Sequence, residues 1–230
     1  MPNHMRCDRH ARSIPAEALM SAPVAGPIAI GALDLAALLC SRVCHDLISP
    51  VGAIINGLEV MEEDKDEETK AFALDLIKRS AGQASAKLQF CRLAFGAAGS
   101  AGAQIELGDA EKAARGLFED GKTAIGWTLP RELVAKNRAK LLLNMLLVAG
   151  GAIPRGGTLN VEAADGGYRV TASGQNTRLA PAVAGLLAGS PAQAVDAHMI
   201  QPLYTGILAR DCGLTVSAVL EGDAVVVLAR

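Results

Sequence analysis

The feature that most constrains this chain is a run of apolar residues, spaced three or four apart, between residues 36 and 61. At about 100° per residue, all of them fall within about 40° of one line along a helix. This first seam consists of Ala36, Cys40, Val43, Leu47, Val51, Ile54, Leu58 and Met61. It predicts a helix over residues 34–63, with Asp34 as the N-cap, that buries one side against other helices.

A second seam of the same spacing follows a charged turn and predicts a second helix over residues 68–95. Its members are Ala73, Ile77, Ala81, Ala84, Leu88, Cys91 and Phe95. Two antiparallel helices cannot bury two such seams by themselves. Because two helical hairpins together close a four-helix bundle, the sequence predicts a homodimer.

His45 lies opposite the first seam, in the hexapeptide His-Asp-Leu-Ile-Ser-Pro at residues 45–50. Its neighbours at helical spacing, Ser49, Gly52 and Asn56, are small and polar, so the surface suits a large docking partner better than an enclosed pocket. Pro50 removes a helix hydrogen bond one turn beyond His45, at a cost of about 3 kcal/mol. This context favours a histidine that accepts a phosphoryl group. The alternative is an ordinary solvated histidine.

Other candidate residues surround His45 on the same helix. Asp46 lies about 100° around the helix and could orient the imidazole or take a proton from it. Arg42 lies about 60° away and could steer an acidic partner or hold phosphate. The predicted partner-binding surface consists of Arg42, Ile48, Ser49, Gly52 and Asn56.

The pattern changes after a glycine-rich linker at residues 96–102. Strands are predicted at residues 104–107, 123–129, 158–163, 168–173, 214–220 and 224–228, and helices at 109–120, 130–149 and within 180–210. This alternation predicts an α/β sandwich whose sheet is covered by helices on one face. The expected organisation is a flexible tail (1–32), a dimerisation and phosphotransfer hairpin (33–98) and the sandwich (103–230).

Composition narrows the classes of partner. The net charge is −2 and there is one tryptophan, so nothing favours nucleic acid or an anionic membrane. Five cysteines, an odd number without metal-site spacing, are typical of a reducing cytoplasm. Pro23 and Pro27 interrupt the apolar stretch at residues 16–33, which is therefore predicted to be neither a signal peptide nor a membrane span.

The order of parts resembles the core of a sensor histidine kinase, in which a dimeric hairpin with the acceptor histidine precedes an ATP-binding sandwich. Residues 45–50 match the kinase pattern His-Glu-Leu-Arg-(Thr/Ser)-Pro at four positions. The nucleotide motifs are broken, because Val148 stands in place of the Mg²⁺-binding asparagine and Ser173 in place of the adenine-binding aspartate. Residues 199–204 lack the glycines of the later box. We therefore expect a degenerate ATPase-like domain.

Residues 45–59, 88–96 and 152–157 more closely resemble the ChpT family of histidine phosphotransferases, a similarity that covers residues 33–230. The resemblance implies a phosphorelay: the receiver aspartate of a hybrid histidine kinase phosphorylates His45, which passes the group to the receiver aspartate of response regulators. It also implies that the chain has no cofactor of its own and that the partner receivers supply Mg²⁺. The alternatives are a pseudokinase-like dimer that inhibits a kinase without carrying phosphate, and an active histidine kinase.

Overall fold

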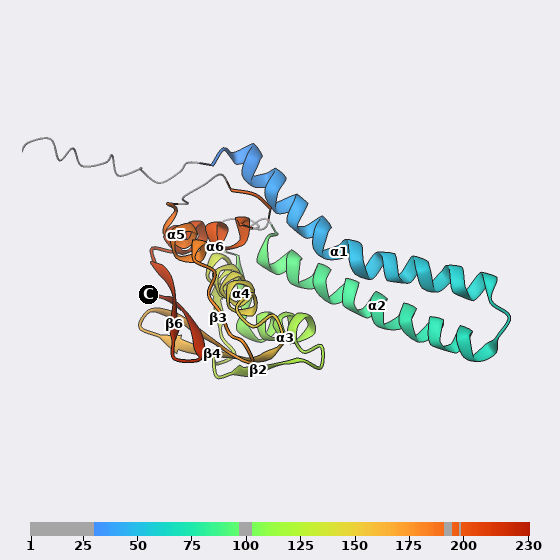
Figure 1. Ribbon diagram of the computed structural model, residues 1–230. Coiled ribbons are helices and arrows are strands. Elements are labelled where there is room, and N and C mark those ends of the chain that lie inside the picture. The colour runs from blue at the N-terminus through green and yellow to red at the C-terminus, as the bar shows by residue number, and fades with distance from the viewer. Residues whose placement is uncertain (1–29, 97–102, 191–194, 198) are drawn as a thin grey trace, which may run out of the picture.

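A computed structural model describes residues 30–96, 103–190, 195–197 and 199–230. They form a long helical hairpin beside a mixed α/β domain, as the sequence predicts (Figure 1). Residues 1–29 of the expected tail, and residues 97–102 of the expected linker, lie outside the described residues.

The hairpin consists of α1 (Ala32–Glu63) and α2 (Glu67–Ala94). Asp66 caps α2, because its carboxylate accepts hydrogen bonds from the backbone N–H and the hydroxyl of Thr69, each at 2.8 Å. These bonds lower the pKa of the Asp66 carboxyl. The N-cap of α1 is Gly31, so the prediction of Asp34 was wrong. Asp34 lies in the first turn instead, where a carboxylate still favours the helix N-terminus.

Small residues allow the two helices of the hairpin to approach closely. Pro50 and Gly57 are the buried residues of α1, and Figure 1 shows the axis of this helix bending near its middle. A Cβ atom at Gly57 would lie 2.6 Å from Cγ1 of Ile77 in α2. Any larger residue at position 57 would therefore push the helices apart.

Within one chain the first seam is only partly covered. Its partly buried members are Val43, Leu47, Ile54 and Met61, and its exposed members are Ala36, Cys40, Val51 and Leu58. The partly buried positions lean toward α2, whereas the exposed ones lie farther around the helix. The hairpin alone therefore leaves an apolar stripe of α1 uncovered.

The α/β domain contains a five-stranded sheet in the order β2-β4-β5-β7-β6. The strands are β2 (Thr123–Trp127), β4 (Gly157–Ala164), β5 (Gly167–Ser173), β6 (Val216–Glu221) and β7 (Ala224–Ala229). β2 and β4 are parallel and the other pairs are antiparallel. Separately, β1 (Gln104–Glu106) pairs with β3 (Leu133–Ala135). The helix predicted from residue 130 was wrong at its start, because this long-range pairing makes residues 133–135 a strand.

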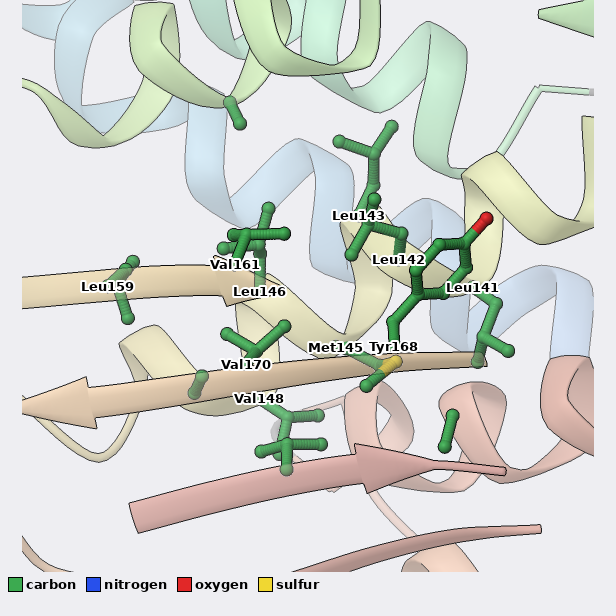
Figure 2. Packing of buried hydrophobic residues seen from close by; sticks show 14 of the residues in the cluster. Leu141, Leu142, Leu143, Met145, Leu146, Val148, Leu159, Val161, Tyr168 and Val170 are labelled. Carbon is green, nitrogen blue, oxygen red and sulfur yellow. The ribbon is translucent and has the colours of Figure 1, made fainter. Parts of the chain in front are cut away.

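Four helices, α3 (Leu107–Phe118), α4 (Lys136–Gly150), α5 (Ala182–Ala188) and α6 (Ile200–Asp211), lie on one side of the sheet (Figure 1). α4 is the centre of the domain, since it is buried on nearly all sides. Figure 2 shows its side chains packed against Leu159 and Val161 of β4 and Val170 of β5.

The hairpin is joined to the domain through buried contacts of α2. Phe90 packs edge-to-face against Phe118 of α3, with ring centroids 6.0 Å apart. The wholly buried Asn144 of α4 donates from Nδ2 to the carbonyls of Ala94 (3.0 Å) and Lys140 (2.7 Å), and its Oδ1 accepts from Nε2 of Gln201 at 2.7 Å. One amide thus links α2, α4 and α6.

We predict that Asn144→Ala lowers the free energy of unfolding by about 2–4 kcal/mol, because it leaves the Ala94 carbonyl and the Gln201 amide buried without their partner. Chemical denaturation followed by circular dichroism measures the loss. Asn160→Ala, at an exposed position of β4, is the matched control and should change stability by less than about 0.5 kcal/mol. Equal stability of the two variants would contradict the role of Asn144 in joining the hairpin to the α/β domain.

Candidate functional site

His45 projects from α1 into solvent, as the sequence predicts. Its side chain is 67% exposed, and its Nδ1 atom lies 3.4 Å from Oδ1 of Asp46. An imidazole in this position can be reached by a large partner, and one of its nitrogens faces a carboxylate. The arrangement allows one ring nitrogen to be held by Asp46 while the other acts on a partner.

Asp46 is itself held by two cationic residues. Its Oδ2 atom accepts from Nε of Arg42, one turn earlier, at 3.0 Å, and its backbone carbonyl accepts from Nζ of Lys87 in α2 at 2.8 Å. The Arg42–Asp46 ion pair is partly solvated, so it contributes at most about 1 kcal/mol to stability. Its effect is to orient the carboxylate that faces His45.

The remaining predicted partner-binding residues form an open surface next to His45. Ile48, Ser49 and Asn56 are exposed, and Ile48 is 70% exposed despite its apolar side chain. A Cβ atom added at Gly52 would meet nothing within 4 Å. The side of α1 that bears His45 is therefore flat and uncovered within this chain.

A crevice of about 280 Å³ lies between the hairpin and the α/β domain, next to Asp46. Its lining includes Arg42, Lys87 and Cys91. Burial raises the pKa of the Cys91 thiol, and the negative charge of Asp46 raises it further. The thiol is therefore neutral near pH 7, which disfavours a nucleophilic role for Cys91.

The segments that the sequence analysis compared with kinase nucleotide motifs lie within the packing of this domain. Val148 is 8% exposed at the end of α4, and Ser173 ends β5. Residues 200–204 form the buried first turn of α6. A cavity of about 230 Å³ remains between α4, α5 and α6, with a mostly aliphatic lining that includes Val148 and Leu186. Within the described ranges, no group of three or more His, Cys, Asp or Glu side chains could hold a metal ion.

Lys87 is the residue of this site that sequence reasoning missed. A signal was present, because Ala73, Ser80, Lys87 and Ala94 recur every seven residues along α2. The other three are small and buried: Ala73 lies next to Gly57 of α1, whereas Ala94 lies against the α/β domain, where its carbonyl accepts from Asn144. A lysine in such a row needs a hydrogen-bond partner, and only the folded hairpin identifies that partner as the carbonyl of Asp46.

Comparisons with known proteins bear on the family to which the chain is similar. Residues 107–224 match the family described as histidine phosphotransferase C-terminal domain. The chain is 50% identical over 196 residues to protein phosphotransferase ChpT of Brucella abortus (strain 2308), covering 83% of this chain and 92% of that protein. A solved structure of a bacterial phosphotransferase is 46% identical, with a TM-score of 0.77 over 89% of this chain and 99% of the other.

Two glycines of α1 should respond to substitution in opposite directions. We predict that Gly52→Ala raises the free energy of unfolding by about 0.5–1 kcal/mol, since alanine favours the helix and its Cβ enters open space. Gly57→Ala should lower it by about 1–2 kcal/mol, because its Cβ collides with Ile77. Thermal and urea unfolding measure both effects. If Gly52→Ala instead lowered the free energy of unfolding, the side of α1 that bears His45 would have to be covered in the folded protein.

Proposed function

The chain belongs to the ChpT family of histidine phosphotransferases, which act in phosphorelays, and we propose that His45 is the residue that carries the phosphoryl group. The observation that carries this proposal is the solvated imidazole with Nδ1 3.4 Å from the Asp46 carboxylate. The small residues on the same side of α1 leave room for a whole protein domain to dock on the nucleophile.

The transfer reaction uses His45 as a nucleophile and then as a leaving group. In this proposal Asp46 accepts a hydrogen bond from Nδ1–H, so that the lone pair of the ring lies on Nε2, which acts as the nucleophile. Nε2 attacks the phosphorus of an aspartyl phosphate, so a P–N bond forms as the P–O bond to the aspartate breaks. A second receiver aspartate then attacks the phosphohistidine, and the P–N bond breaks.

The partners in this proposal are receiver domains in the cytoplasm: that of a hybrid histidine kinase as donor and those of response regulators as acceptors. Phosphoryl transfer requires positioning and neutralisation of charge, and receivers of this kind bring their own Mg²⁺. This division of tasks fits the bare surface around His45. The exposed Ile48 supplies an apolar contact beside Ser49, Gly52 and Asn56, while Arg42 lies at the edge nearest the α/β domain.

The uncovered apolar stripe of α1 supports a homodimer. Val51, Ile55 and Leu58 are 46%, 51% and 48% exposed, and α2 adds Leu74 and Leu88 at 41% and 51%. By length and composition alone α1 could also cross a membrane. The polar face that carries Arg42, Asp46 and His45 argues against that role. A second hairpin would bury the stripes of both copies in a four-helix bundle.

We predict that His45→Gln abolishes phosphoryl transfer. The wild-type chain, mixed with a radiolabelled phospho-receiver of a hybrid kinase and Mg²⁺, should gain an acid-labile, base-stable label and pass it to a response-regulator receiver. His45→Gln should gain none. Labelled ATP with Mg²⁺ should not label the wild-type chain directly. Labelling by ATP would identify an active kinase, and inhibition of a kinase by His45→Gln without any transfer would identify a pseudokinase-like inhibitor.

Substitutions on the docking face should separate binding from chemistry. Gly52→Trp should slow transfer at least tenfold by holding the receiver away from His45, because the added ring points into the space the receiver occupies. Glu63→Gln, at the far end of α1, should transfer at the wild-type rate. Normal transfer by Gly52→Trp would place the receiver elsewhere.

We predict that Val51→Glu combined with Leu58→Glu converts the dimer to a monomer, because two buried charges per chain would oppose the bundle. Sedimentation at micromolar concentration measures the molecular mass. Phe72→Glu is the control: Phe72 is 66% exposed but lies about 160° around α2 from Leu74, away from the stripe. A wild-type chain that sediments as a monomer would contradict the proposed dimer.

A further inference from the structure

Pro50 leaves a gap in the hydrogen bonding of α1 at the residue next to His45. In an α-helix the carbonyl of residue 46 accepts from the N–H of residue 50, and proline has no N–H. The carbonyl concerned belongs to Asp46, which faces the imidazole of His45. The turn of α1 that presents His45 therefore lacks a backbone hydrogen bond that an uninterrupted helix would have.

Lys87 supplies a replacement donor from the opposite helix. Its Nζ atom donates to the Asp46 carbonyl at 2.8 Å, and this partly buried bond joins residues 41 positions apart. Lys87 lies at the crevice between the hairpin and the α/β domain, which Arg42 and Asp46 also line. The ammonium therefore reaches α1 from the side of this crevice, which Ile48, Ser49, Gly52 and Asn56 do not line.

We propose that Lys87 is a positioning residue for phosphotransfer: its ammonium replaces the backbone donor that Pro50 removes and fixes the turn of α1 that presents His45 and Asp46. The proposal rests on the proposed role of His45. In this arrangement α2, and not α1 alone, sets the orientation of the nucleophile. Two cationic residues thus hold Asp46: Lys87 bonds to its backbone carbonyl, and Arg42 bonds to its side-chain carboxylate.

Lys87→Met tests the role of the ammonium, because methionine keeps an unbranched apolar stem of similar length. The rate of transfer from the phosphorylated chain to a saturating receiver should fall roughly tenfold to a hundredfold, the loss expected from a misplaced nucleophile. The receiver concentration that gives half the maximal rate should change less than about twofold, because Lys87 lies off the docking face. Lys87→Arg should keep most of the rate, and Lys78→Met, at an exposed position of α2, should keep all of it.

Pro50→Ala provides the decisive comparison, because alanine restores an N–H for the Asp46 carbonyl. In the Pro50→Ala background, Lys87→Met should slow transfer by less than about threefold, so that the two substitutions are strongly coupled. An equal loss in both backgrounds would overturn the proposal and indicate a direct contact of Lys87 with the receiver. An unchanged rate for Lys87→Met in the wild-type background would also overturn it.

Two further results separate this inference from the proposed function. If Lys87→Met does not fold, the double variant should fold, because its Asp46 carbonyl again has a donor; a double variant that is equally unfolded counts against the proposal. Transfer by His45→Gln would refute the role of His45 itself. Loss of transfer in His45→Gln with normal transfer in Lys87→Met would refute only the role of Lys87.

Discussion

The attachment of α2 to the α/β domain is the constraint on which the other parts of the structure depend. Asn144, wholly buried, bonds to the last turn of α2 and to α6, while Phe90 packs edge-to-face on Phe118. A buried amide with three partners fixes the orientation of the helices it joins as well as the distance between them. Each lost bond would leave a buried polar group with neither a protein partner nor water. α2 is thereby held in one orientation, and α1 is placed by packing against α2 and, through Leu35, Leu38 and Leu39, against α6.

Helix α1 has three differently used sides. One side packs on α2 through Pro50 and Gly57, a second carries the exposed apolar stripe, and the third carries His45. A hydrogen bond to a charged group contributes about 1.5–3 kcal/mol, which is similar to the cost of about 3 kcal/mol for a proline inside a helix. The Lys87–Asp46 bond can therefore offset much of the free-energy cost of Pro50, and it does so without using any residue of the docking face.

In the α/β domain, the segments that lack the kinase nucleotide motifs contribute to packing. Asn144 links three helices through its side-chain amide, whereas Val148 adds an aliphatic side chain to the end of α4. The first turn of α6 is buried, where glycines would leave a backbone open to phosphates. Such residues stabilise the domain that holds the hairpin in place.

The sequence by itself determined the two helices, the mixed α/β domain and the exposure of His45, because helical periodicity and strand alternation are local patterns. It also placed Asp46 beside His45, since neighbours on one helix have fixed geometry. Tertiary structure alone decided that residues 133–135 form a strand, because their partner β1 is distant in sequence. It likewise decided that Lys87 reaches the carbonyl freed by Pro50, because a bond across 41 residues depends on the register of two packed helices.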